Sequence, residues 1–367
     1  MDSLTQATLG ALCGELLLRK QLGWKGAAWG FFFGTLPDLD IIMSPWLDAM
    51  DSLRNHRSLS HSIFLMLLMS PVFGLLLAKL HKHISVKRAS AFVLLTWFTH
   101  VFIDCFNSYG TQIFEPFSDY RVTLNNISII DPLFTLPMLV GVIWALCINR
   151  ESEKRSRIVA ITTAWITFYT CVSFLFQSLA QRQFESQLTE AGITADDTIT
   201  SNTLGNIFLW RMIARDENHF YVSYWSIWDS KDRPTSIDAI PRNPELAAPF
   251  KDSKAFETLD WFSQGWWKIT PMSENSVALV DLRFAEMHQI DEGNSRKIPP
   301  FIWQLSLDED GSVKESRASV KGDFKPKKTL KELGQRIIGR SPDWMTPDWP
   351  WESTKTLSPE NETERVN

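Results

Sequence analysis

The sequence predicts an α-helical transmembrane bundle of about five or six helices, followed by a soluble α+β domain that is mainly β. Long apolar runs occur only in residues 1–180, whereas 181–367 is polar and rich in aromatic residues. We therefore place a membrane-embedded domain at 1–180, a β-rich domain at 181–340 and an extended or disordered tail at 341–367. The net charge of −5, with no basic stripe, argues against nucleic-acid binding.

The clearest predicted membrane span is 158–180, because it contains no Asp, Glu, Lys or Arg and is long enough to cross the hydrocarbon core. Three more spans are predicted at 63–80, 89–106 and 129–148. The stretches 3–18 and 24–43 have shorter uncharged cores, so each is either a tilted span or a re-entrant segment.

The basic residues of the loops predict the orientation of these spans. Eleven Lys and Arg residues lie in the loops 19–25, 79–88 and 149–157, but only three lie in 44–62 and 107–128. Because cytoplasmic loops carry an excess of Lys and Arg, the first group is predicted to be cytoplasmic. The second group and everything after residue 180 are then predicted to lie on the periplasmic side of a bacterial inner membrane.

The second half contains four runs with strand-like composition, at 206–214, 219–228, 276–284 and 300–308. The first two are predicted to pair as a hairpin across residues 215–218. A short helix is predicted at 328–338. The function of this β-rich domain is not readable from its residues.

Ionisable residues occur in or beside the apolar runs of the first third of the chain, where they are energetically expensive and therefore indicate function. They are Asp2, Asp38, Asp40, His56, His61, His100 and Asp104. His and Asp without Cys form a ligand set suited to zinc or manganese. The orientation, which was derived without these residues, places all of them at one end of the bundle. We therefore expect a single site at the outer membrane face.

Each of these residues also has a plain structural interpretation. His100 and Asp104 are four residues apart on one helix face, so they could share a metal or form a buried ion pair without one. Asp38 or Asp40 alone would favour helix capping. His56 and His61 are five apart, so one of them is expected before a helix begins, with Ser60 as a possible cap. We assign no function to the remaining histidines, His81, His83, His219 and His288.

Several ordered motifs carry a family resemblance. The segments MDSLTQATLGA, GTLPDLDII, NHRSLSHS and THVFIDCFNSYGTQIFEPFSDYRV resemble the LexA-regulated, membrane-bound metal-dependent hydrolase family, which is YdjM-like and distantly similar to zinc-dependent phospholipase C. The resemblance covers about residues 1–180 and is looser beyond them. It implies one or two Zn²⁺ ions, with ligands at Asp38, Asp40, His56, His61, His100 and Asp104. Many relatives have His where this chain has Gln6, which puts one ligand or one metal in doubt.

The resemblance implies a hydrolase in which zinc-activated water attacks an ester or a phosphoester. Asp38 or Asp40 is the predicted general base, and Arg57 and Arg121 could hold an anionic group. Further polar candidates for substrate contact or for support of the ligands are Asp2, Gln6, Asn107, Tyr109, Asp119 and Asp131. The depth of the site favours a lipid or a lipid-linked substrate.

Two other classes of function remain open from the sequence. A transporter or an ion- or proton-conducting protein also places His and Asp inside a bundle, although its polar residues are expected along the whole length of several spans. A non-catalytic envelope protein with a structural metal is the second alternative. Metal content and activity after substitution of His100 and Asp104 would separate these classes. Protein partners and oligomeric state are not predicted.

Overall fold

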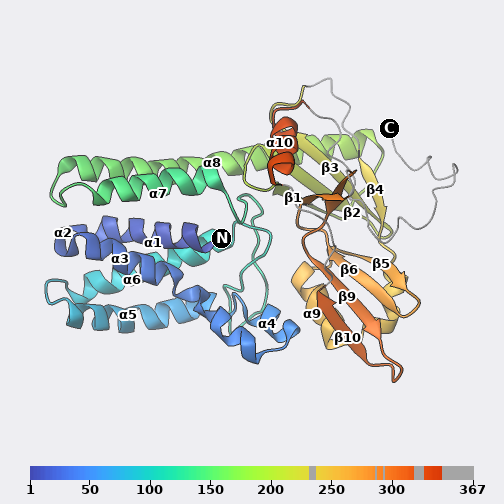
Figure 1. Ribbon diagram of the computed structural model, residues 1–367, viewed down its shortest axis with the longest axis horizontal. Helices are drawn as coiled ribbons and strands as arrows, with labels where there is room; N and C mark the ends of the chain where they lie inside the picture. The colour runs from blue at the N-terminus through green and yellow to red at the C-terminus, as the bar shows by residue number, and fades with distance from the viewer. Residues whose placement is uncertain (231–236, 286, 292–293, 318–325, 341–367) are drawn as a thin grey trace. The chain divides into compact units, whose positions relative to one another are not determined.

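The computed structural model describes residues 1–230, 237–285, 287–291, 294–317 and 326–340 (Figure 1). The chain divides into two compact units, a helical unit of residues 1–174 with 204–206 and a second unit of residues 175–203 with 207–367. The boundary falls inside the long helix α8, Glu153–Glu190, six residues before the boundary predicted at 180. The predicted tail at 341–367 lies outside the described residues.

The helical unit contains most of the helices of the chain, and they run side by side in Figure 1. Their bounds are α1 Ser3–Leu17, α2 Arg19–Leu22, α3 Trp24–Thr35, the 3-10 helix η1 Pro37–Trp46, α4 Ala49–Asn55, the 3-10 helix η2 Leu59–His61, α5 Ile63–Leu80, α6 Val86–Asp104, α7 Pro132–Leu146 and the first part of α8. Among the described residues, α5, α6 and α8 are long and apolar enough to cross a membrane, and α7 is a shorter apolar helix. The predicted helical membrane region is therefore confirmed, with three helices of membrane-spanning length among the described residues where about five or six were predicted.

Helices α1 and α3 pack with their backbones in close contact. A Cβ atom at Gly10 would lie 2.1 Å from the carbonyl oxygen of Gly30, and one at Gly30 would lie 2.0 Å from the carbonyl oxygen of Gly10. Only glycine allows this approach. Helix α3 ends at Thr35, shortly before Pro37, and the chain continues as η1. The stretch predicted as one segment at 24–43 is therefore two elements, and the second carries Asp38 and Asp40.

The predicted cytoplasmic turns lie together at one end of the helical unit (Figure 1). Arg19 at the start of α2 donates a hydrogen bond of 2.9 Å to Ser156 Oγ, and Trp29 donates one of 2.8 Å to His81 Nε2. The buried Glu15 and Arg155 side chains form an ion pair with an Nη2–Oε1 distance of 2.6 Å. These contacts join α1 and α2 to α8, and α3 to the turn after α5, at the end of the unit opposite to the predicted site residues.

The second unit contains two four-stranded antiparallel sheets. The first has the order β1 Asp197–Asn202, β2 Leu209–Arg215, β3 His219–Ser226 and β4 Asp238–Pro241, and the second has the order β10 Val313–Arg317, β9 Ile302–Leu307, β6 Ser276–Asp281 and β5 Trp267–Ser273. The remaining elements are the ladder of β7 Met287–Asp291 with β8 Asn294–Ile298, the 3-10 helix η3 Pro244–Phe250, and the helices α9 Lys254–Ser263 and α10 Pro326–Ile337. The predicted hairpin and C-terminal helix are confirmed as β2–β3 and α10.

Candidate metal centre

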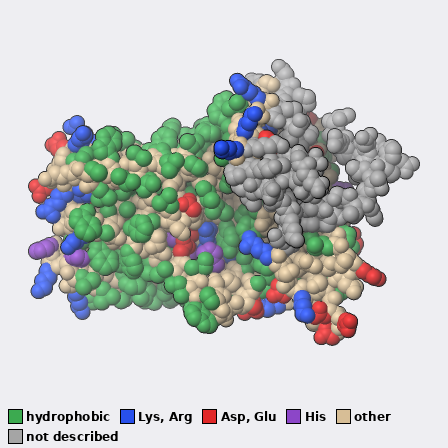
Figure 2. All heavy atoms as spheres, viewed as in Figure 1, with side chains coloured by type: hydrophobic (Ala, Val, Ile, Leu, Met, Phe, Trp, Pro, Cys, Tyr) green, Lys and Arg blue, Asp and Glu red, His purple; other side chains and the backbone are tan. Residues whose placement is uncertain are grey.

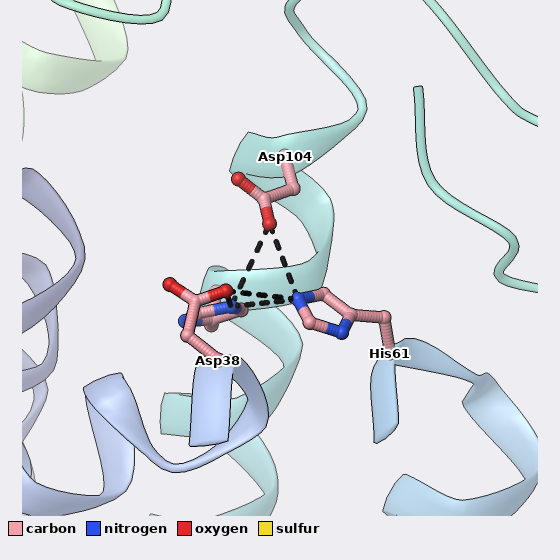
Figure 3. Close-up of side chains that lie close together, drawn as sticks. Asp38, His61 and Asp104 are labelled. Atoms are coloured by element: carbon pink, nitrogen blue, oxygen red, sulfur yellow. Dashed lines mark hydrogen bonds and ion pairs between the residues drawn. The ribbon is translucent and has the colours of Figure 1, made fainter. Parts of the chain in front are cut away.

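Four side chains from three elements converge at one end of the helical unit (Figure 3). Asp38 lies at the start of η1, His61 is the last residue of η2, and His100 and Asp104 are one turn apart at the end of α6. His61 Nε2 lies 3.1 Å from His100 Nε2, 3.3 Å from Asp38 Oδ1 and 3.4 Å from Asp104 Oδ2. His100 Nε2 lies 3.5 Å from Asp38 Oδ1 and 3.6 Å from Asp104 Oδ2.

These five distances fit the edges of a coordination tetrahedron. When ligand atoms lie about 2.0–2.1 Å from a central zinc ion, tetrahedral geometry places them about 3.3–3.4 Å from one another. Five of the six distances between the four candidate ligand atoms run from 3.1 to 3.6 Å, and all six are within 4.8 Å. Two imidazole nitrogens and two carboxylate oxygens therefore surround a space of the size that a small divalent cation requires.

Both histidine rings are held by hydrogen bonds at the nitrogen that faces away from this space. His100 Nδ1 lies 2.6 Å from the carbonyl oxygen of Gly34, which can only accept a hydrogen bond, so the ring is protonated there. Its Nε2 then carries the lone pair. His61 Nδ1 lies 2.9 Å from Ser60 Oγ and 3.6 Å from Asp40 Oδ2. Partners of this kind fix the orientation of metal-binding imidazoles. The expected capping role belongs to Ser62 of α5, not to Ser60.

The carboxylate of Asp104 has a different environment at each oxygen. Its Oδ1 accepts a hydrogen bond of 2.8 Å from Gln6 Nε2, lies 3.3 Å from Arg57 Nη2 and contacts the amino group of Met1. Its Oδ2 is buried and accepts no hydrogen bond from the described residues. A buried carboxylate oxygen without a donor is costly unless a cation compensates it. Since Oδ2 is the atom that faces His61 and His100, the residues present fit a bound cation.

Arg57 holds the loop between α4 and η2 against the centre. Its φ of 61° lies in the left-handed region, which costs about 1–3 kcal/mol for a residue other than glycine. Its backbone N–H donates to Asp40 Oδ2 at 2.9 Å, and its guanidinium reaches Asp104 and, at 3.2 Å, Asn107 Oδ1. The strained conformation therefore places Arg57 in contact with both Asp40 and Asp104.

The electrostatics of the centre also favour a cation. Burial alone lowers the pKa of His61, but the carboxylates of Asp104 and Asp38 outweigh it, and the pKa of His61 lies above its usual value. Burial raises the pKa of Asp38, but hydrogen bonds with His100 and His61 dominate and hold this pKa well below its usual value. The site thus stabilises positive charge at its centre.

Asp40 and His56 form a second group together with Asp38, in which the ligand atoms also lie within 4.8 Å of one another. Asp40 Oδ1 lies 3.1 Å from His56 Nδ1, and Asp40 Oδ2 accepts hydrogen bonds from the Arg57 N–H and, at 3.1 Å, from Ser60 Oγ. The structure therefore brings together all six predicted ligands, but as two groups joined by Asp38. Both oxygens of Asp40 already have protein partners.

The other sequence candidates lie around the centre or away from it. Asp2 and Asp131 accept hydrogen bonds from the first turns of α1 and α7, and the hydroxyl of Tyr169 donates to the Asp131 carboxylate, with its oxygen 3.0 and 2.8 Å from Oδ1 and Oδ2. Asp119 is exposed and lies 4.0 Å from Arg54. These contacts give Asp2 and Asp131 helix-capping roles that join the helices of the bundle.

Arg57 and Arg121 flank the ring of Tyr109, with guanidinium carbons 4.8 and 4.9 Å from its centroid. Arg121 also donates hydrogen bonds to the carbonyl oxygens of Tyr109 and Gly110. Both guanidiniums therefore stabilise the loop after α6.

Gly34 is a site residue that was not predicted from the sequence, because its role comes from a carbonyl group and leaves no side-chain signal.

We predict that Gln6→Ala lowers metal affinity without abolishing it. Gln6 is buried and donates to Asp104 Oδ1, so its removal leaves this ligand less well oriented. Loss of such a supporting partner typically costs about 10–100-fold in metal affinity. Competition titration with a chromophoric chelator measures the change. The matched control is Gln21→Ala, which lies near the opposite end of the helical unit and should leave metal affinity unchanged.

Comparison with known proteins gives a family match over the residues of the helical unit. Residues 1–180 match the family model described as YdjM inner membrane protein. A Bacillus subtilis (strain 168) protein named uncharacterized protein YfhP is 24% identical over 330 residues, which cover 86% of this chain and 94% of that protein. The match therefore extends over both units. No solved structure matches the chain.

Proposed function

We propose that this chain, whose residues 1–180 match the family model described as YdjM inner membrane protein, is a metal-dependent hydrolase of the inner membrane. Its cation site is the group Asp38, His61, His100 and Asp104. The observation that carries the proposal is the spacing of their four ligand atoms, of which five of the six separations match tetrahedral edges at 3.1–3.6 Å, together with the buried Oδ2 of Asp104 that accepts no hydrogen bond from the described residues.

We propose a single Zn²⁺ ion in this site. Imidazole nitrogen and carboxylate oxygen in tetrahedral spacing suit zinc, and the group is complete without residue 6. In the second group, the oxygens of Asp40 are already engaged by Ser60, by the N–H of Arg57 and by His56. We therefore expect one ion per chain. A stoichiometry of two would contradict this assignment.

Zinc would supply Lewis acidity, which lowers the pKa of a coordinated water from about 15.7 to about 7. Because the four protein ligands complete a tetrahedron, that water would need a fifth position, on the open side beside Asp38. The protein must also move a proton. His56 is suited to this task because its side chain is 26% exposed, its Nδ1 lies 3.1 Å from Asp40 Oδ1, and its ring centroid lies 6.2 Å from that of the ligand His61. His56 is thus the general acid and base, and Asp40 is its positioning residue.

The proposed substrate is an ester or a phosphoester of a lipid or a lipid-linked molecule. The ligands lie at the end of the helical unit opposite to the basic turns, which supports a site at the periplasmic face under the positive-inside rule. Asp38 is the most accessible of the four ligands, with a side chain that is 23% exposed, so the open side of the centre lies along η1.

The test is hydrolysis by the purified full-length protein in proteoliposomes, measured with phospholipids and with chromogenic ester and phosphodiester probes. His56→Ala should lower turnover by about 100-fold or more, because general acid–base groups typically contribute 10²–10⁴-fold, while zinc content is unchanged. The control is His83→Ala on the turn between α5 and α6. Metal-loaded protein that hydrolyses none of these substrates would favour a structural metal.

A further inference from the structure

The 3-10 helix η1 is amphipathic, and its two sides have different surroundings. Its polar residues Asp38, Asp40 and Ser44 face the interior, where Asp38 joins the metal centre and Ser44 accepts a hydrogen bond from Ser52. Its apolar side chains face outward and are exposed. These outward residues are Leu39, Ile41, Ile42, Met43 and Trp46, with exposed fractions of 46–74%. No charged residue occurs from Ile41 to Leu47.

Exposed apolar side chains also lie on other elements of the helical unit, among them the candidate span α5. Phe31 and Phe32 at the end of α3 are exposed, as are Phe64, Leu67 and Leu68 on α5. Phe117, which is 80% exposed on the loop after α6, packs edge-to-face on Phe64 with ring centroids 5.8 Å apart. Figure 2 shows hydrophobic side chains over most of the visible face of the helical unit. The outward face of η1 thus adds to the exposed apolar surface of the helical unit.

We infer that η1 lies in the plane of the membrane interface, with its apolar face inserted among the lipids and its polar face closing the metal centre. The occupant of this face is membrane lipid, because the same helical unit exposes apolar side chains on the candidate span α5 and the face carries a terminal Trp, a residue enriched at the level of the lipid headgroups. The rim of the metal centre is then part of the membrane surface, and amphiphilic molecules reach Asp38 laterally from the bilayer.

Depth measurement with spin labels tests this inference. Ile42→Cys is introduced into the full chain after the exposed Cys147 and Cys171 are replaced by Ala, and the labelled protein is reconstituted in phosphatidylcholine and phosphatidylglycerol vesicles. Collision rates with oxygen and with a water-soluble nickel chelate are compared. Leu68→Cys on α5 is the lipid reference, and Glu309→Cys in the turn between β9 and β10 is the aqueous reference.

The label at residue 42 should give an oxygen-to-nickel collision ratio that is clearly shifted from the Glu309 value toward the Leu68 value. Met43→Cys provides a second label on the same face and should give a similar shift. A ratio equal to that of Glu309 would overturn the inference, since η1 would then lie in water. Exclusion of both reagents would overturn it as well, because protein would then cover the face.

The inference goes beyond the proposed function and fails separately from it. The depth of η1 is measured without any turnover, whereas the proposed function depends on metal content and hydrolysis. If η1 is inserted in the membrane but the protein is inactive, the inference holds and the proposed hydrolase function fails. If η1 lies in water and the protein is active, the inference fails and the proposed function holds.

Discussion

Asp104→Asn is expected to reduce the affinity of the protein for zinc by more than about 100-fold, a larger loss than removal of a supporting partner causes. The substitution removes the negative charge at Oδ2, the buried atom that faces both histidines. The Asn side chain keeps the size of Asp104 but can present only one oxygen. Arg57 attracts an oxygen at the Oδ1 position, so the single amide oxygen occupies that position and the amide nitrogen faces the two histidines. Zinc content after dialysis, measured by inductively coupled plasma mass spectrometry, reports the loss.

Two variants make this prediction specific. Asp119→Asn changes an exposed carboxylate on the loop after α6 and should retain full zinc content. Asp38→Asn removes a partly exposed ligand and should lose zinc as Asp104→Asn does, with less risk to folding because Asp104 also balances the buried Arg57. Unchanged zinc content in both Asp104→Asn and Asp38→Asn would exclude the proposed ligand set.

Gly30→Leu is expected to destabilise the helical unit by at least about 3 kcal/mol, the upper end of the usual cost of overpacking. A Cβ atom at residue 30 meets the backbone of Gly10 at 2.0 Å, and backbone cannot move aside as a flexible side chain can. Helices α1 and α3 must then separate. Because α3 supplies the Gly34 carbonyl that holds His100 and leads into η1, the variant should also lose bound metal.

Thermal unfolding in detergent, followed by circular dichroism, measures this effect. The matched control is Ala28→Leu, which adds similar bulk on the exposed side of the same helix and should leave the melting temperature nearly unchanged. A Gly30→Leu protein that melts at the wild-type temperature would show that the close packing of α1 and α3 does not exist. Equal destabilisation by both variants would point to general disturbance of α3.

The membrane helices could be predicted well from the sequence because uncharged apolar runs of this length are typical of helices that cross a bilayer. The predicted span 63–80 matches α5 at both ends, and 158–180 lies inside α8. The short strands β1 and β4 were missed, since their polar residues show no clear alternation and are ordered by pairing with β2 and β3. Tertiary contacts decide such strands, and one sequence does not contain them.

The candidate site could be predicted as a set of residues but not as a geometry. His and Asp at one end of the bundle indicated a shared centre, and the structure brings all six together. Their division into a four-residue group and an Asp40–His56 pair depends on the left-handed turn at Arg57. Non-glycine residues seldom adopt this conformation, so no residue pattern indicates it. Gln6 was predicted either to contact substrate or to support the ligands, and only its hydrogen bond to Asp104 distinguishes these two roles.

X-ray absorption spectroscopy of the purified, zinc-loaded protein tests the central claim most directly. Two histidine nitrogens and two carboxylate oxygens predict one zinc ion per chain with a single shell of nitrogen and oxygen ligands at about 2.0–2.1 Å and no sulfur. The His61→Ala variant should lose this ion. A protein that binds no zinc after loading, or a shell that contains sulfur, would contradict the proposed metal centre.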